Sequence, residues 1–115
     1  MPLPRHLDSP FYQLLRAEDI EGFNRERQQH SRLDLSEGDF RGLDLRGMNA
    51  AGIDFRDAYF RNTDLRGLDL RAACLEGASL AHAQISGSYF PVELSAAEIL
   101  MSVQHGTRLR YRSGE

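Results

Sequence analysis

Side chains able to do chemistry are few in this chain, and their spacing forms no catalytic arrangement. The four histidines, His6, His30, His82 and His105, are scattered, and no spacing brings a nucleophile, a base and an orienting acid together. The lone Cys74 cannot form an internal disulfide and has no Cys or His partner at metal-ligand spacing. The glycines recur at intervals and build no GxGxxG or GxxxxGK phosphate loop. We therefore expect a protein that is not an enzyme, with no catalytic residues, no cofactor-binding residues and no metal site.

The polar residues that do recur with a fixed spacing are Asp and Arg. Six of each line the middle of the chain: Asp34, Asp39, Asp44, Asp54, Asp64 and Asp69, and Arg41, Arg46, Arg56, Arg61, Arg66 and Arg71. An Asp and an Arg two positions apart lie on the same side of an extended segment and can pair, although exposed pairs contribute little to stability. The formal net charge of the whole chain is −3, so it lacks the basic excess of a nucleic-acid-binding protein. We expect no direct nucleic-acid binding.

The element that must position these side chains is a repeat of five residues. Every fifth position from 35 to 90 is apolar, and eleven of the twelve are large: Leu35, Phe40, Leu45, Ala50, Phe55, Phe60, Leu65, Leu70, Leu75, Leu80, Ile85 and Phe90. A period of five fits neither a helix nor a straight strand, since the side chains would point in different directions. Turn-compatible residues such as Gly42, Gly47 and Asn62 follow the apolar centres by two positions. The pattern predicts a short extended piece and then a corner in every unit, with the apolar residue facing inward.

Individual units resemble the A-(D/N)-L-x-x unit of the pentapeptide-repeat family. Four of them are GDFRG at 38–42, LDLRG at 43–47, TDLRG at 63–67 and ASLAH at 78–82. The resemblance covers residues 33–92 and implies a bacterial-type repeat solenoid of the all-β class, a right-handed quadrilateral β-helix with four units, hence twenty residues, per coil. Twelve units would make about three coils. Positions twenty apart would then stack as interior ladders.

Ala50 interrupts the repeat. A large side chain is missing there, and an unfilled void of that size costs about 2–4 kcal/mol. The adaptable Met48, or Ile20 or Phe23 from the preceding segment, are the candidates to fill it. We expect Ala50 to be a socket for an N-terminal cap.

The flanks of the repeat, residues 1–32 and 93–115, carry helix signals. Ser9 followed by Pro10 is a helix start, and residues 17–19 predict a break or second start, so one broken helix or two short ones should cap the first coil. A partner-binding amphipathic helix is the alternative for this segment. After the repeat, Ser95 predicts a short helix that ends near Gly106. Residues 107–112 then alternate like a strand, which either covers an open edge of this chain or pairs with a second copy.

The candidate interface lies at the C-terminal side of the repeat. From residue 72 to residue 92 the one formal charge is Glu76, and this neutral surface either contacts a partner or packs under the chain's own C-terminal segment. The residues proposed for it are Tyr89, Leu94, Ile99, Leu100, Leu109 and Tyr111.

The function we expect is that of a rigid, non-enzymatic protein–protein interaction or structural module, with an unknown protein partner and a possible homodimer through the C-terminal segment. The family resemblance supplies an alternative, inhibition of DNA gyrase or topoisomerase by mimicry of DNA. Duplex DNA has one charge per about 1.7 Å of axis, and a rod of three coils with paired Asp and Arg falls short of that. The N-terminal stretch lacks a signal-peptide core and no run approaches the roughly 18 apolar residues of a membrane span, so we expect no membrane association and a cytoplasmic protein.

Overall fold

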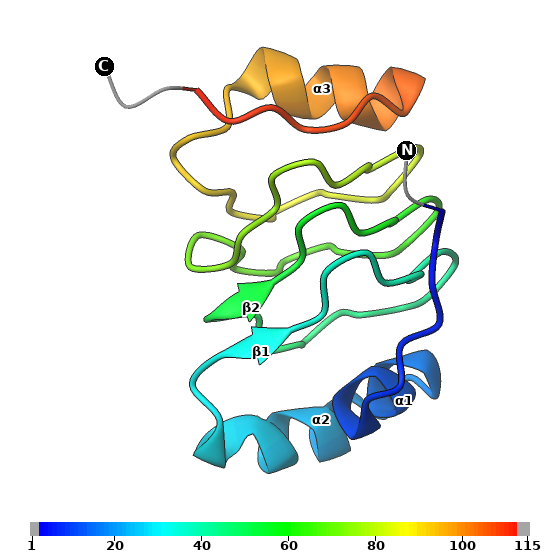
Figure 1. The fold of residues 1–115 in the computed structure, drawn as a ribbon. Helices are drawn as coiled ribbons and strands as arrows, with labels where there is room; N and C mark the ends of the chain where they lie inside the picture. Colours follow the sequence, from blue (N-terminus) through cyan, green and yellow to red (C-terminus); the bar gives the residue numbers. More distant parts are fainter. Residues whose placement is uncertain (1–2, 113–115) are drawn as a thin grey trace.

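The computed structural model describes residues 3–112 as a stack of coils with a helical cap at each end (Figure 1). Two short helices, α1 (Pro10–Arg16) and α2 (Ile20–Glu26), and the 3₁₀ turn η1 (Arg27–Gln29) precede the coils. The strands β1 (Leu33–Asp34) and β2 (Ile53–Asp54) lie in the first and second coils, and the helix α3 (Ala96–His105) follows the last. The molecule measures 35 × 26 × 26 Å.

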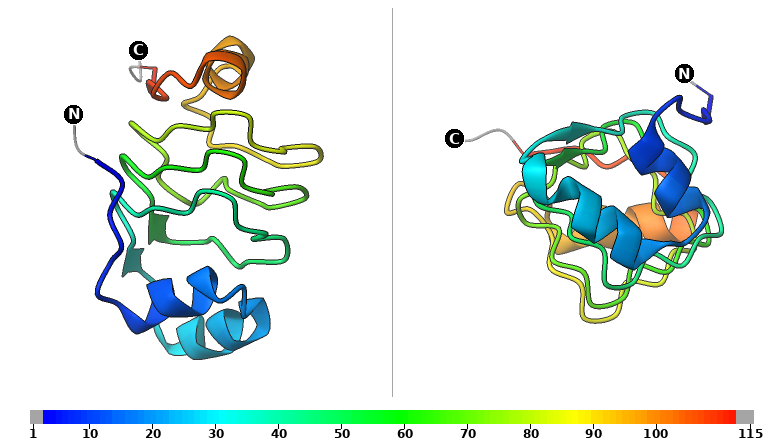
Figure 2. Two further views of the ribbon diagram at one scale, coloured as in Figure 1. Left: turned by 90° about the vertical axis from the view of Figure 1, so that its right-hand side faces the viewer. Right: turned by 90° about the horizontal axis from the view of Figure 1, so that it is seen from below.

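The coils stack in a register of twenty residues. β1 pairs in parallel with β2 through Leu33 with Ile53 and Asp34 with Asp54. Parallel bridges with the same offset join Asp39 to Tyr59, Asp44 to Asp64, Asp54 to Cys74, Tyr59 to Ser79, Asp64 to Gln84 and Asp69 to Tyr89. Four five-residue units therefore complete one turn of a β-helix-like solenoid, and Figure 2 shows the coils superimposed when seen along the stack.

The expectation of an all-β chain is met only in part. β1 and β2 have two residues each, and the other paired residues between the coils form single bridges. The reason is geometric: a corner after every fifth residue leaves too few extended residues on each side for a longer strand. Gly67 (φ 75°) and Asn62 (φ 58°), both with a left-handed backbone, are examples of these corners.

The repeated apolar residues form the interior. From Leu35 to Leu80, the ten residues at steps of five are each 2 % exposed or less, whereas Ile85 and Phe90 are only partly buried. Aromatic rings pack between the first two coils, with Phe40 parallel to Phe60 at 5.4 Å between centroids and edge-on to Phe55 at 5.5 Å. The interior residues of the last half-coil are thus less buried than those of the earlier coils, so the C-terminal end of the solenoid differs from the N-terminal end.

The N-terminal helices pack under the first coil as a cap. Ser9 accepts a hydrogen bond from the backbone N–H of Tyr12, with Pro10 in the first turn, as its position predicts. Tyr12 and Phe23 are completely buried, and the Tyr12 hydroxyl donates to the carbonyl of Asp39 at 2.8 Å. The amphipathic face of these helices is therefore used inside the protein.

The C-terminal segment folds back over the last coil. Ser95 caps the N-terminus of α3, and Gly106 ends it in the left-handed conformation with φ 72°. Residues 107–112, which we name the C-terminal strap, then run antiparallel to the last coil: Leu109 donates to the carbonyl of Ala78 and accepts from the N–H of Gly77, both at 2.8 Å. Of the two alternatives for this segment, the structure shows the one in which it covers an edge of its own chain.

Candidate protein-interaction surface

The backbone edge at the N-terminal end of the solenoid is bonded by side chains of the cap. Glu18 accepts from the N–H of Asp44 at 2.6 Å. Asn24 accepts from the N–H of Asn49 at 2.8 Å and donates to the carbonyl of Gly47 at 2.9 Å. On these two sides the cap supplies partners that the neighbouring coil would otherwise provide, which blocks pairing with another chain there.

Two further contacts lie at this end. Arg5 forms a parallel bridge to the first coil, donating from its N–H to the carbonyl of Glu37 at 3.1 Å and accepting from the N–H of Asp39 at 2.8 Å. The guanidinium of the buried Arg27 donates to the carbonyl of Asn49 at 3.0 Å. Residues of the same chain thus cover three sides of the N-terminal end, along residues 38–52, whereas within residues 3–112 no group accepts from the N–H of Asp34 on the remaining side.

The C-terminal end is bonded in the same way on two of its sides. On the first side, the N–H of Leu75 donates to the Tyr111 hydroxyl and the N–H of Gly77 to the carbonyl of Leu109. On the second side, the N–H of Leu80 donates to Ser102 Oγ at 2.9 Å. The N–H of His82 donates to the carbonyl of Val103 at 2.8 Å.

The remaining two sides carry an open edge, which we define as residues 83–90 of the last coil. In lower coils, the equivalent N–H groups of Leu65, Gly67 and Leu70 donate to the coil above. Within residues 3–112, however, no group accepts from the N–H groups of Ile85, Gly87 and Phe90, and none donates to the carbonyls of Ala83 and Ser88. Three donors and two acceptors therefore face the end of the rod without a protein partner.

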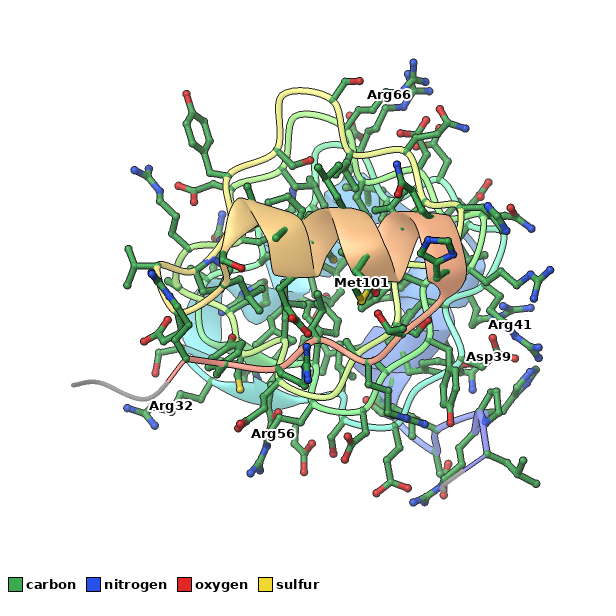
Figure 3. The ribbon with its side chains drawn as sticks, turned by 90° about the horizontal axis from the view of Figure 1, so that it is seen from above. Arg32, Asp39, Arg41, Arg56, Arg66 and Met101 are labelled. Carbon is green, nitrogen blue, oxygen red and sulfur yellow. The ribbon has the colours of Figure 1, made fainter. Side chains whose placement is uncertain are left out.

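Four apolar side chains are exposed on the last coil, the segment after it and α3. The exposed fraction is 60 % for Tyr89, 77 % for Val92, 52 % for Leu100 and 44 % for Met101. Seen from above, α3 crosses the end with the strap on one side, and the last coil extends beyond α3 on the other side, near Arg66 (Figure 3). Residues 77–92 contain no Asp, Glu, Lys or Arg, so the edge lacks the charges by which proteins usually discourage strand pairing.

The six residues proposed as an interface have different surroundings in the structure. Tyr89 and Leu100 are exposed, as an interface requires. Leu94 and Leu109 are 7 % and 1 % exposed and belong to the chain's own core, so their assignment to an interface is wrong. Ile99 and Tyr111 are partly buried against that core. An alternating or amphipathic pattern shows which residues share a face but not whether that face meets the same chain or another.

Sequence reasoning missed the most exposed part of this surface. Val92 and Met101 were not among the candidates, and neither were the unbonded N–H groups of Ile85, Gly87 and Phe90. Met101 lies only about 100° around α3 from the buried Ser102, so helical spacing does not mark it as exposed. Free backbone groups have no sequence signal, because every residue in the repeat carries the same ones.

The sides of the rod are striped with paired charges. Asp39 with Arg41, Asp44 with Arg46, Asp54 with Arg56, Asp64 with Arg66, and Asp69 with Arg71 form ion pairs of 2.7–2.8 Å. Hydrogen bonds from the guanidinium groups lower the pKa of Asp44 and of Asp69 to about 2. Because each carboxylate has a cation beside it, these faces have little net field.

Among residues 3–112, the residue types that commonly bind metal ions form no metal site. Cys74 is partly exposed in an open hollow of about 680 Å³ that it shares with Arg32, Asp34, Asp54, Arg56 and Glu76. In the described part of the chain no three His, Cys, Asp or Glu residues are grouped so as to hold a metal ion. None of the helices within residues 3–112 is long and apolar enough to cross a membrane.

Comparison with known proteins identifies the repeat. A family model described as pentapeptide repeats matches in eight copies, over residues 39–77 and 53–90. No curated protein and no solved structure gives a significant match to the chain.

Proposed function

The chain is a pentapeptide-repeat protein, and we propose that it works as a rigid, non-enzymatic protein–protein interaction module whose binding surface is the C-terminal end. The observation that carries this proposal is the difference between the two ends. The chain itself bonds the N-terminal edge on three sides, along residues 38–52, whereas residues 83–90, which form two sides of the C-terminal end, keep the unpaired N–H groups of Ile85, Gly87 and Phe90 and carry the exposed Tyr89.

Rigidity follows from the way the coils are joined. Each interior side chain packs in a ladder, and the coils are linked by backbone hydrogen bonds at intervals of twenty residues. Such a scaffold holds the end surface in one conformation, so a partner does not have to order it on binding.

Recovery of partners from the native host tests the proposal. A tagged full-length chain is cross-linked in the cells, purified, and compared with Leu100→Glu, which puts a charge on the C-terminal end, and with Gln28→Glu, which puts the same charge on the N-terminal end. We expect a specific set of proteins to be lost with Leu100→Glu and retained with Gln28→Glu. Equal recovery with all three chains would contradict the proposed surface.

The paired charges argue against inhibition of DNA gyrase by mimicry of DNA. A mimic needs a dense negative surface, but five of the carboxylates along this rod pair with the Arg two positions on, as in Asp64 with Arg66 at 2.7 Å. We therefore expect no inhibition in a gyrase supercoiling assay, and inhibition at low micromolar protein would favour mimicry instead.

A further inference from the structure

We infer that the partner of the C-terminal end is a different protein that presents an extended segment, in which a large apolar residue is followed two positions later by a tyrosine, and that this segment pairs antiparallel with residues 85–88. This inference rests on the proposed function, because it states the chemistry of the partner for the same surface. The chemistry is inferred from the bonds that the chain's own C-terminal strap makes.

The strap makes three hydrogen bonds to one side of the last coil. The N–H of Leu75 donates to the Tyr111 hydroxyl at 2.8 Å. The N–H of Gly77 donates to the carbonyl of Leu109 at 2.8 Å, and the N–H of Leu109 donates to the carbonyl of Ala78 at 2.8 Å. Two residues of one extended segment, in the arrangement Leu-x-Tyr, therefore bond two donors and one acceptor of the coil.

The same three groups recur without a partner half a turn further around the solenoid. Because twenty residues complete a turn, ten residues carry the chain to the opposite side. The counterparts ten positions on are Ile85, Gly87 and Ser88. Within residues 3–112, no group accepts from the first two N–H groups and none donates to the carbonyl of Ser88. The backbone conformation also agrees, since φ is 73° at Gly87 and 80° at Gly77 under the strap.

The apolar interior is incomplete on the side of the open edge. Leu75 and the strap residue Leu109 are each 1 % exposed, so the strap completes the interior on its own side. Ile85, ten positions after Leu75, is only partly buried. A large apolar side chain placed as Leu109 is in the strap would cover it, and burial of both side chains would stabilise the complex.

The helix α3 leaves room for such a segment beside it. Seen from above, the strap lies along one flank of α3 and the last coil extends beyond the other flank (Figure 3). Glu98 is turned toward the strap, where it bonds the guanidinium of Arg110 at 3.0 Å. Leu100, two residues on and so about 200° around the helix, lies on the other flank. The partner's segment would therefore lie between Leu100 and the open edge.

The strap of a second copy is not available as this segment. Its Leu109 is buried and both of its backbone groups are already bonded within its own chain. Residues 77–92 contain no Asp, Glu, Lys or Arg, so the edge carries no charge that would discourage an approaching strand. Free backbone groups on an uncharged edge are what a peptide requires in order to add to a sheet as a further strand.

Amide hydrogen exchange, measured by NMR on the full-length chain, tests the inference with a synthetic peptide as the probe. The peptide has the sequence of the strap, Thr-Arg-Leu-Arg-Tyr-Arg. The control peptide carries an N-methyl group on its leucine, which removes the N–H donor and keeps the charge. We expect the first peptide to slow exchange at Ile85 and Gly87 at least about tenfold, and the control to have a much smaller effect. Exchange at Leu75 and Gly77 should be slow without any peptide, because the strap already bonds these groups.

Two matched variants of the chain locate the peptide. Its dissociation constant should rise at least about tenfold with Leu100→Glu, which puts a charge beside the open edge, and should not change with Gln28→Glu at the other end of the rod. Because Leu100 is 52 % exposed, Leu100→Glu should keep the circular dichroism spectrum and melting temperature of the native protein.

Any of three results would overturn the inference. The first is unchanged exchange at Ile85 and Gly87 with up to about 5 mM peptide, and the second is an equal effect of the two peptides. The third is slow exchange at both positions in the chain alone, with sedimentation showing twice the chain mass, since the occupant would then be a second copy. The proposed function would survive these results if Leu100→Glu still abolished recovery of a different protein from cells, and it would fail if recovery did not depend on Leu100.

Discussion

The hydroxyl of Tyr111 accepts a hydrogen bond from the backbone N–H of Leu75 at 2.8 Å, and so a side chain near the end of the sequence takes the place of a missing fourth coil. Burial raises the pKa of Tyr111 to about 12, which fits a phenol held against the core. On this side of the last coil, Tyr111 therefore bonds Leu75 while Leu109 of the strap bonds the N–H of Gly77.

Tyr111→Phe should destabilise the protein by about 1–2 kcal/mol, because the N–H of Leu75 would lose its acceptor while the ring still covered it. Chemical denaturation of the two proteins measures the difference. Tyr111→Leu, which also removes the ring, should cost more. Equal stabilities of the native protein and Tyr111→Phe would show that water replaces the hydroxyl.

Alkaline pH should destabilise the protein, because burial disfavours the phenolate form of Tyr111 more than the hydrogen bond from Leu75 favours it, which leaves its pKa raised. A phenol with a pKa raised from 10 to about 12 in the folded state contributes stability that is present below pH 10 and is lost as the pH rises toward 12. The melting temperature of the native protein should fall over this range more than that of Tyr111→Phe. If the melting temperatures of the two proteins fell equally with pH, the loss of stability would not come from the Tyr111 hydroxyl.

Acid should destabilise the rod through its Asp residues. The pKa of Asp44 and of Asp69 is lowered to about 2 by hydrogen bonds from Arg46 and Arg71, below the ordinary value of about 3.9 in an unfolded chain. The contribution of these pairs is therefore complete above about pH 4 and disappears as the pH falls toward 2. Melting temperatures from pH 7 to pH 2 in low salt should show this decline, and it should be smaller in an Asp44→Asn, Asp69→Asn double variant.

Two corner glycines with the same backbone conformation should respond differently to alanine. At Gly67 (φ 75°) no atom lies within 4 Å of the position that a Cβ would take, whereas at Gly52 (φ 76°) a Cβ would collide with the carbonyl of Ser31. Gly67→Ala should cost about 1–2 kcal/mol for the left-handed backbone alone, and Gly52→Ala about 3 kcal/mol or more. Denaturant titration of both variants measures the difference, and equal losses would mean that the segment at Ser31 moves aside at no cost.

Ala50 marks the seam between the first coil and the N-terminal cap. It is 2 % exposed, and the backbone N–H and carbonyl of the neighbouring Asn49 are bonded by Asn24 and Arg27 of the N-terminal segment. Ala50→Leu should therefore overpack the site and cost about 1–3 kcal/mol, while Ala51→Leu, on the exposed neighbour, should change little. A higher melting temperature for Ala50→Leu would show a void and not a filled socket.

Much of the fold could be predicted because the repeat is short and strict. The apolar residue of every unit, such as Phe40 or Leu65, points inward wherever the corner is placed, and Ser9 and Ser95 mark helix starts by local chemistry alone. The candidate site could be predicted only in part. Leu109 belongs to an alternating segment that was expected at an interface, yet it is buried in its own chain. The alternating pattern is the same whether the strand pairs with its own chain or with another, so the sequence could not distinguish the two.

The sequence by itself determined the period, the inward-facing residues and the presence of a cap at each end, because these depend on side-chain type at fixed local spacing. Only the tertiary structure decided which edges the caps leave open. Hydrogen bonds such as those of Asn24 to Asn49 and of Tyr111 to Leu75 join residues 25 and 36 positions apart. No local pattern specifies them, and the unpaired N–H groups of Ile85, Gly87 and Phe90 are identified only after every other edge has been accounted for.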